Sequence, residues 1–226
     1  MIDDIAALQY LYGGNLSTRA GADVYGAELL TSDKPFEATI WDAGGVDLID
    51  WRHGAMASVI DLTPGSLSYF GGKISAANDE SIAQLKAGEG VLGIAFGTDI
   101  ENAYGGLGAD VLLGNDLSNV LYGGADSGQG DTLTGGAAAD YFVCNLLDAS
   151  ILQVNVDRVT DFHDGEDKIA LSGSLNYEDL MIINISSGDF NNVLIEHKQT
   201  GKYLLELENI EINQIDTHDF ISFEIV

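Results

Sequence analysis

The sequence is poor in basic residues. Its 226 residues include 36 Asp and Glu but only 9 Lys and Arg, which leaves a formal net charge of −27 at pH 7. In a folded body this charge repels itself, and bound cations or high salt are needed to relieve the repulsion. Nucleic acids and anionic membrane surfaces are excluded as partners, because binding to polyanions needs clustered Lys and Arg.

Cysteine is almost absent as well. Cys144 is the only one, so an internal disulfide is excluded and stability has to come from packing and metal binding. Because no His or basic residue lies near it in the sequence, a small buried hydrophobe is a better interpretation of Cys144 than a reactive thiol. The hydrophobic fraction of 46% is that of a globular protein that can bury a core.

Long apolar runs are also lacking. No run of 18 apolar residues occurs, so no membrane insertion is expected. The start, Met1-Ile2-Asp3-Asp4, has neither the basic nor the apolar segment of a Sec signal peptide. If the chain is exported, the sequence predicts a route that does not use an N-terminal signal.

Catalytic motifs are missing too. The sequence contains no His-Glu-x-x-His and no Gly-x-Ser-x-Gly, which are the signatures of zinc peptidases and serine hydrolases. The four histidines lie far apart without the paired spacing of a zinc site, at His53, His163, His197 and His218. We therefore expect no enzyme activity from this chain and no catalytic residues.

What the sequence does have is a repeat. Acidic or amide side chains recur nine, nine, twelve and nine residues apart, at Glu101, Asp110, Asn119, Asp131 and Asp140. Two residues after each of them stands an apolar residue, at Ala103, Leu112, Leu121, Leu133 and Phe142. The pattern predicts a coil in which each winding gives one oxygen ligand to an ion and one apolar side chain to a core.

The glycines between these residues match a known template. Residues 105–113 fit the nine-residue Gly-Gly-x-Gly-x-Asp-x-apolar-x pattern at every fixed position. Residues 114–122 keep the pattern but place Asn119 at the ligand position, residues 123–134 carry three extra residues around Ser127, and residues 135–143 keep the acid. Ordinary Gly-Asp turns of a β-protein are the alternative, but several turns in register favour the repeat.

Outside the repeats, the periodicity divides the chain into four segments. Residues 1–14 predict a short amphipathic helix that Gly13-Gly14 ends. Residues 15–99 predict irregular β structure leading into the roll, and residues 100–145 form the repeat block. Residues 146–226 alternate apolar and polar side chains, with a hairpin expected from Val193 to Leu207, and predict a β cap over the open end of the coil.

The ligand chemistry of the repeats indicates calcium. Ca²⁺ takes six to eight oxygen ligands at about 2.3 to 2.6 Å, and glycine-rich turns expose backbone carbonyls beside each carboxylate. One turn supplies only part of such a shell, so two stacked turns are needed for each ion. Ion binding and folding are therefore expected to be linked.

With the repeats, further segments resemble the C-terminal RTX domain of the serralysin family of secreted zinc proteases, without the protease domain. They include residues 4–13, 16–21, 41–47, 100–103, 157–162 and 165–169. The resemblance covers nearly the whole chain. It implies an all-β fold: a parallel β-roll, or RTX solenoid, with a β-sandwich-like cap and one short N-terminal helix.

The resemblance also implies several calcium sites in the roll. One site joins Gly106, Gly108 and Asp110 to Gly123, Ala125 and Asp131. A second joins Asn115, Leu117 and Asn119 to Gly135, Ala137 and Asp140. Backbone carbonyls and the acid or amide side chains of these residues are the implied ligands, and Asp157 is implied in a last site near the cap.

Two more implied sites lie upstream of the repeats. The family motifs place Arg19, Gly21 and Asp23 with Asp42, Gly44 and Asp47 at one ion. They place Gly45, Asp47, Asp99 and Glu101 at another. On the residues alone, Asp42 and Asp47 fit a solvated turn with Asx caps equally well; the resemblance favours ligands.

The end of the chain, Asp219 to Val226, resembles the uncleaved signal of type I secretion substrates and is compatible with a final strand. The leading hypothesis is a secreted, extracellular, noncatalytic calcium-binding protein that calcium folds after it passes the type I secretion machinery. A second is the C-terminal secretion and folding part of a serralysin-like zinc protease, with a protease domain as partner. A third is a surface adhesin or carbohydrate-binding module, for which Tyr69-Phe70 is a faint indication.

Overall fold

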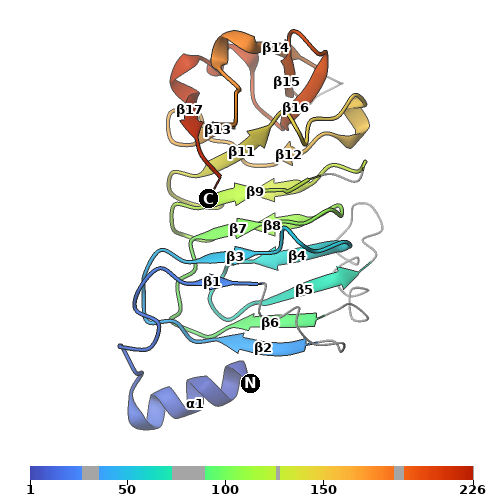
Figure 1. Cartoon of the computed structure of the whole chain (residues 1–226). Helices are drawn as coiled ribbons and strands as arrows, with labels where there is room; N and C mark the ends of the chain where they lie inside the picture. The colour runs from blue at the N-terminus through green and yellow to red at the C-terminus, as the bar shows by residue number, and fades with distance from the viewer. Residues whose placement is uncertain (27–35, 73–89, 126–127, 186–190, 226) are drawn as a thin grey trace.

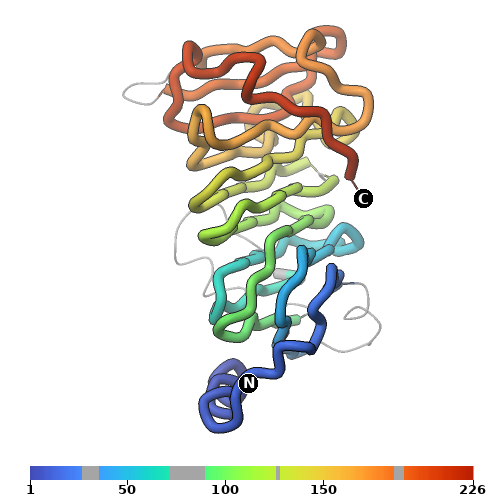
Figure 2. Tube along the Cα trace, turned by 90° about the vertical axis from the view of Figure 1, so that its left-hand side faces the viewer, coloured from blue at the N-terminus to red at the C-terminus, as the bar shows by residue number. Residues whose placement is uncertain are grey.

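The repeats fold into very short strands joined by glycine-rich turns. In the computed structural model, successive strands of the repeat block alternate between two facing sheets. The chain winds upward from α1 at one end to a cap at the other (Figure 1). Figure 2 shows the windings stacked along one axis. The predicted all-β parallel roll with one helix is confirmed. The structure describes residues 1–26, 36–72, 90–125, 128–185 and 191–225.

The first sheet, which we call sheet A, has seven strands in the described part of the chain, and every pair of neighbouring strands in it is parallel. In order across the sheet they are β1 (Val24–Tyr25), β3 (Leu48–Asp50), β7 (Asn102–Tyr104), β9 (Val120–Tyr122), β11 (Tyr141–Asn145), β13 (Lys168–Ser172) and β17 (Phe220–Phe223).

Sheet B faces it and mixes parallel with antiparallel pairs. Its order is β14 (Leu180–Asn184), β15 (Val193–His197), β16 (Lys202–Leu207), β12 (Arg158–Val159), β10 (Thr132–Thr134), β8 (Val111–Leu113), β4 (Ala57–Asp61), β5 (Leu67–Gly72), β6 (Gly90–Ile94) and β2 (Phe36–Ile40). The antiparallel pairs are β14 with β15, β15 with β16, β4 with β5 and β5 with β6.

The register of the parallel strands stacks one apolar side chain on the next. In sheet A, Ile49, Ala103, Leu121, Phe142 and Ile169 are aligned, and all are at most 1% exposed. In sheet B, Ile60, Leu112, Leu133, Val159 and Leu207 are aligned and fully buried. The apolar positions of the repeat therefore form the core, as the spacing predicts.

The segments outside the repeats extend these two sheets. Residues 15–99, expected to be irregular, contribute β1 to β6, although residues 27–35 and 73–89 lie outside the described part of the chain. The predicted hairpin is present as β15 and β16, whose turn ends at Gly201 with a positive φ of 65°. The cap also contains the 3-10 helices η3 (Gln153–Asn155), η4 (Tyr177–Asp179), η5 (Ile212–Gln214) and η6 (Thr217–Asp219).

The predicted N-terminal helix is α1 (Ile2–Tyr12), and Gly13 ends it with a φ of 80°. All residues of α1 are described and none is buried; Tyr10 is 90% and Tyr12 82% exposed. No helix in the described part of the chain combines the length and the apolar character needed to cross a bilayer.

Glycine is required where neighbouring turns touch. A Cβ on Gly105 would lie 2.1 Å from the carbonyl oxygen of Gly123, and one on Gly114 would lie 2.0 Å from that of Gly135. Gly136 additionally has a φ of 102°. In the same turn, Ala138 has a φ of 65°, a left-handed conformation that costs a residue with a Cβ about 1 to 2 kcal/mol.

Ala138→Gly should therefore stabilise the calcium-saturated protein. Ala138 is exposed, so the substitution loses no packing, and glycine removes the left-handed strain at the cost of its own chain entropy. We expect a net gain of about 0.5 to 1 kcal/mol in the free energy of unfolding, measured by denaturant titration.

Ala137→Gly is the matched control. Ala137 is exposed in the same turn but is not among the residues with a positive φ, so glycine should destabilise the protein by about 0.5 to 1 kcal/mol. Equal effects of the two substitutions would contradict the assignment of strain to Ala138.

Candidate metal centres

Polar residues stack above one another along both edges of the roll, in the turns that enter the strands. On the edge entering sheet A they are Asp23, Asp47, Glu101, Asn119, Asp140 and Asp167, which we call the sheet A ladder. On the edge entering sheet B they are Ser58, Asp110, Asp131 and Asp157, which we call the sheet B ladder. Each stands two residues before a buried core position, because strand register carries both columns together.

Each ladder residue holds the one below it by a hydrogen bond. In the sheet A ladder, the N–H of Asp23 donates to Asp47 Oδ1 at 2.7 Å and the N–H of Asp47 donates to Glu101 Oε2 at 2.7 Å. Higher up, Asn119 N–H donates to Asp140 Oδ1 at 2.8 Å. The carboxylates are thus placed one per winding, at the separation of neighbouring strands.

The sheet B ladder repeats the arrangement. The N–H of Asp110 donates to Asp131 Oδ1 at 2.7 Å, and the N–H of Asp131 donates to Asp157 Oδ1 at 2.9 Å. Asp110 also closes its own turn, since its Oδ2 accepts the N–H of Gly106 at 2.6 Å. Both oxygens of Asp110 are therefore oriented by backbone donors before any ligand binds.

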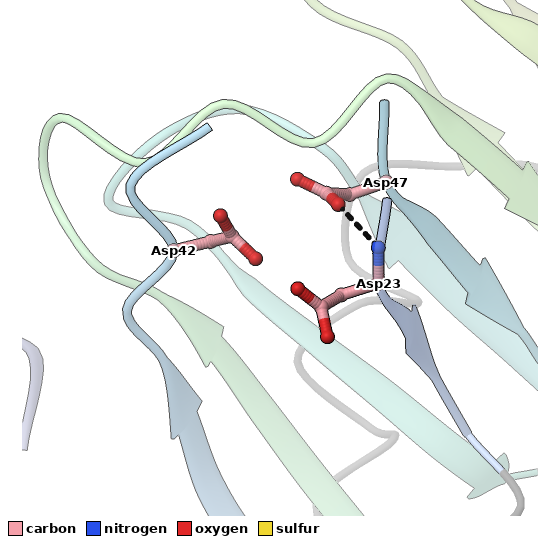
Figure 3. A group of neighbouring side chains, drawn as sticks. All are labelled: Asp23, Asp42 and Asp47. Atoms are coloured by element: carbon pink, nitrogen blue, oxygen red, sulfur yellow. Dashed lines mark hydrogen bonds between the residues drawn. The ribbon is translucent and has the colours of Figure 1, made fainter. Parts of the chain in front are cut away.

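Three carboxylates converge at the N-terminal end of the sheet A ladder. Asp23, Asp42 and Asp47 each place one carboxylate oxygen within 4.8 Å of the others, and Figure 3 shows the three groups facing a common space. Asp42 is 1% and Asp47 0% exposed. Asp42 Oδ1 accepts the N–H of Gly44 at 2.8 Å, and its Oδ2 accepts the hydroxyl of Tyr25.

Asp47 is the key member of this group. Its Oδ2 is buried and has no hydrogen-bond partner among the described residues. Burial raises the pKa of Asp47 to about 6; the Asp23 N–H opposes the rise, and the charges of Asp42, Glu101 and Asp23 add to it. A buried carboxylate oxygen without a donor, beside two like charges, is a site that a proton or a hard cation would stabilise.

The backbone around this cluster fits a cation. A Cβ on Gly45 would lie 2.2 Å from the carbonyl oxygen of Gly21 and 2.9 Å from Asp47 Oδ1, so only glycine allows these oxygens to approach. Carboxylate and carbonyl oxygens form the donor set of hard cations such as Ca²⁺. The residues present therefore fit the calcium that the RTX resemblance implies.

Burial perturbs the aspartates of the repeats in the same direction. It raises the pKa of Asp110 to about 6, against the opposing hydrogen bonds from Gly106 and Ser58. It raises the pKa of Asp140 to about 7, and the nearby charges of Asp167, Asp161 and Glu166 add to that rise. Both ladders thus hold carboxylates whose charge is unfavourable without a counter-ion.

The structure brings most of the predicted site residues together in pairs of neighbouring turns. Gly106, Gly108 and Asp110 adjoin the turn of Gly123, Ala125 and Asp131, and Asn115, Leu117 and Asn119 adjoin that of Gly135, Ala137 and Asp140. Within the inserted residues of the third repeat, 126 and 127 lie outside the described chain. Arg19 stands close by Tyr25, with its guanidinium carbon 4.8 Å from the ring centroid.

Asp99 is the exception. Its side chain is exposed, whereas the adjacent Thr98 is fully buried. Thr98 Oγ1 accepts the N–H of Asp42 at 3.3 Å, so it is the threonine rather than the Asp99 carboxylate that contacts the acidic cluster. Sequence reasoning missed Thr98 because a single threonine carries no recognisable ligand signal.

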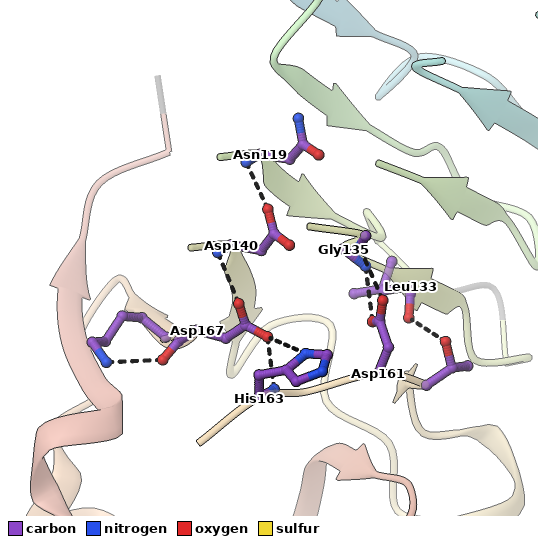
Figure 4. A network of polar contacts seen from close by, with 10 residues as sticks. Asn119, Leu133, Gly135, Asp140, Asp161, His163 and Asp167 are labelled. Atoms are coloured by element: carbon purple, nitrogen blue, oxygen red, sulfur yellow. Dashed lines mark hydrogen bonds and ion pairs between the residues drawn. The ribbon is translucent and has the colours of Figure 1, made fainter. Parts of the chain in front are cut away.

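Asp161 and Asp167 were also missed (Figure 4). Asp167 continues the sheet A ladder into the cap, and Asp161 lies beside the start of the turn at Gly135. Asp167 is 2% exposed and accepts the N–H of Asp140 at 3.0 Å through Oδ1. Asp161 accepts the N–H groups of Gly135 and Gly136, both at 2.9 Å. The signal was available, because Asp167 precedes the buried Ile169 by the same two residues that separate each repeat acid from its core position.

Comparison with known proteins agrees with this geometry. A sequence model of the family described as Peptidase M10 serralysin C terminal matches residues 5–225. The chain belongs to this family. Metalloprotease AprA of Pseudomonas entomophila (strain L48) is 36% identical over 218 residues, which cover 88% of this chain and 42% of that protein. Serralysin G of Dickeya chrysanthemi is 38% identical over 220 residues, covering 89% and 43%.

This serralysin C-terminal chain spans about two-fifths of the length of these curated relatives and matches their C-terminal portion. Among solved structures, the solution structure of the AlgE6R3 subunit from the Azotobacter vinelandii mannuronan C5-epimerase aligns with 93% of this chain and 83% of its own. The TM-score of that alignment is 0.32 and the identity 17%, a likeness too distant to bear on function.

The raised pKa values predict how pH acts on the calcium-depleted protein. A carboxylate whose pKa is higher in the folded than in the unfolded chain stabilises the fold when protonated. For Asp47, Asp110 and Asp140 this contribution is complete below pH 3.8 and is lost as the pH rises through about 6 to 7. Calcium-depleted protein should therefore hold more structure at pH 5 than at pH 8, by far-UV circular dichroism.

Saturating calcium should reverse this dependence, because protons compete with the ion for the same oxygens. The calcium-loaded protein should be most stable at pH 7 to 8 and weaken as the pH falls below about 6. A calcium-depleted sample that gains structure between pH 5 and pH 8 would contradict the assignment of these carboxylates.

Proposed function

We propose that this chain is a noncatalytic calcium-binding module that is secreted and that calcium folds outside the cell. The observation that carries the proposal is the cluster of Asp23, Asp42 and Asp47, in which the buried Asp47 Oδ2 has no hydrogen-bond partner among the described residues. At neutral pH, where Asp47 is largely charged, such an arrangement is unfavourable unless a cation occupies the space between the carboxylates.

The donor set favours Ca²⁺ over other metals. Carboxylate and carbonyl oxygens suit hard cations, whereas the imidazole and thiolate ligands of zinc are missing from the cluster. Mg²⁺ demands a near-ideal octahedron and keeps several waters, whereas the larger Ca²⁺ accepts more ligands in a more flexible geometry. Family membership supports the same ion.

The proposed ligands follow the pairs of neighbouring turns. Three pairs are proposed to share an ion across the interval between their turns. The residues are Arg19, Gly21 and Asp23 with Asp42, Gly44 and Asp47; Gly106, Gly108 and Asp110 with Gly123, Ala125 and Asp131; and Asn115, Leu117 and Asn119 with Gly135, Ala137 and Asp140. Asp47 further pairs with Glu101, with Gly45 and Asp99 contributing through the backbone, and Asp157 with Asp131.

Compartment then decides the state of the chain. In the submicromolar calcium of a cytosol, the charge of −27 and the stacked carboxylates oppose folding and keep the chain loose enough for a type I secretion channel. Outside the cell, millimolar calcium is sufficient to occupy sites with the dissociation constants of about 10⁻⁴ to 10⁻³ M that are typical of extracellular modules. Folding there would also oppose return through the channel.

A second function is favoured by α1 and by the length of the relatives. The helix exposes Leu8, Tyr10, Leu11 and Tyr12, and the chain spans about two-fifths of proteins named metalloprotease and serralysin. We infer that the chain also serves as the C-terminal part of such a protease, with α1 against a catalytic domain. The chain alone should leave casein intact with zinc added; cleavage would overturn the noncatalytic assignment.

Asp47→Asn tests the calcium proposal directly. The amide keeps an oxygen for the Asp23 N–H but removes one of three clustered charges. Without calcium the variant should be at least as stable as the wild type, because buried repulsion falls. With calcium it should be less stable, and the affinity of this site should fall by roughly tenfold or more, measured by calorimetric calcium titration.

Asp116→Asn is the matched control, since it removes the same charge from an exposed position in a repeat turn. It should leave the calcium titration almost unchanged. If Asp47→Asn bound calcium as the control does, Asp47 would not be a ligand. If the wild type kept the same spectrum and melting temperature with and without calcium, the proposed function itself would fail.

A further inference from the structure

One interval of the sheet A ladder is built differently from the others. Elsewhere in the ladder, the backbone N–H of one residue donates to the carboxylate of the residue above it. Asn119, which lies above Glu101, has no carboxylate to accept such a bond. Instead, Asn119 Nδ2 donates to the carbonyl oxygen of Glu101 at 2.8 Å. The direction of the side-chain hydrogen bond is reversed at this level of the roll.

Asn115 completes the arrangement. Its Nδ2 donates to the carbonyl oxygens of Leu62 at 3.1 Å and Ile100 at 2.9 Å, and its Oδ1 accepts Asn119 Nδ2 at 3.1 Å. Both amide nitrogens use their two hydrogens, and both amide oxygens accept backbone N–H groups, from Leu117 and Asn115. The pair is 8% and 0% exposed, so these bonds are made away from water.

The carbonyl oxygens are the decisive feature. Three of them, from Leu62, Ile100 and Glu101, accept hydrogen bonds from side-chain amide N–H groups. A neutral amide donor satisfies a carbonyl lone pair as a cation would, and it does so at any calcium concentration.

The opposite edge has a neutral residue at the adjoining level. Ser58, which is fully buried, takes the ladder position below Asp110. Its N–H and Oγ both donate to Asp110 Oδ1, at 2.5 and 2.8 Å. The two edges therefore carry hydrogen-bond donors in place of acids where β4 meets β8 and where β7 meets β9.

We propose that Ser58, Asn115 and Asn119 form a calcium-independent seam, in which their side-chain donors take the place of an ion toward Leu62, Ile100, Glu101 and Asp110. The other side of the turn from Asn115 to Asn119 still faces the proposed ion site shared with Gly135, Ala137 and Asp140. The inference rests on the proposed calcium function and refines it. Ser58 of the seam pairs across the strands with Phe70, whose ring centroid lies 4.2 Å from that of Trp51. It is the part of the roll that keeps its structure when calcium is low.

Hydrogen exchange of the full chain over a series of free calcium concentrations tests this without any substitution. The turn at residues 114–120 belongs to the seam, and the turn at 135–141 occupies the same edge in the next winding, with Asp140 at the ladder position. In chelator, amides of 114–120 should exchange at least roughly tenfold more slowly than those of 135–141, and the two should converge at saturating calcium. Equal or faster exchange at 114–120 in chelator would overturn the seam.

Asn115→Asp provides a second test. The substitution keeps Oδ1 for Leu117 and keeps the backbone, through which Asn115 enters the proposed ligand set, but turns an oxygen toward the carbonyls of Leu62 and Ile100. Ser118→Asp is the control, since it adds the same charge at an exposed position of the same turn. Asn115→Asp should raise the calcium midpoint of folding at least roughly twofold above the control.

The outcomes separate the two proposals. A midpoint for Asn115→Asp equal to or below that of Ser118→Asp, in a wild type that still folds with calcium, would overturn the seam and leave the calcium function standing. A wild type whose spectrum and exchange are the same with and without calcium would overturn both.

Discussion

Repulsion between stacked buried carboxylates is the constraint on which the rest of this structure depends. A parallel roll repeats the same position at every winding, about 4.8 Å apart, so an acid at that position becomes a column of like charges. Burial strengthens the repulsion, as the raised pKa values of Asp47, Asp110 and Asp140 show. Under the proposed calcium function, the cations that neutralise these columns would complete the fold.

The turns make neutralisation feasible because they bring backbone oxygens to the same place. Gly45, Gly105 and Gly114 stand where a Cβ would collide with a carbonyl of a neighbouring turn. Hydrogen bonds from each winding to the acid of the next fix the carboxylates in advance, so little side-chain entropy remains to be lost on binding. Preorganisation of this kind requires the windings to be stacked already, which couples binding to folding.

Not every level of the roll uses charge. Ser58, Asn115 and Asn119 donate hydrogen bonds from neutral O–H and N–H groups to carboxylate or carbonyl oxygens of the neighbouring winding. These donors carry no net charge and need no ligand. A solenoid is stabilised mainly between nearest neighbours, so a neutral interval changes where folding can begin and how far loss of an ion spreads. With the proposed ions bound, ionic and neutral intervals in one column would make the dependence of the chain on cations graded rather than uniform.

The sequence by itself determined the period, the core and the ladder acids of the repeat block. Asp110 and Leu112, or Asp140 and Phe142, are two residues apart, and residues two apart point to the same face of a strand, so each winding buries both on the inner side of the roll. The helix, the hairpin of β15 and β16 and the family could be predicted for the same reason: local patterns specify local structure. Asp167 followed the same rule and was missed only because its turn lacks the glycine template.

Only the tertiary structure decided the contacts that cross windings outside the period. The family resemblance had already grouped Asp42 with Asp23 and Asp47, but only the fold shows that Thr98 rather than the Asp99 carboxylate contacts Asp42. Likewise, only the fold shows that the Asn115 amide donates to residues 15 and 53 positions away. Such contacts depend on which windings lie next to each other along the roll axis and on the direction in which each side-chain amide points. Both are set by stacking of the whole roll, which the order of residues in any single turn does not encode.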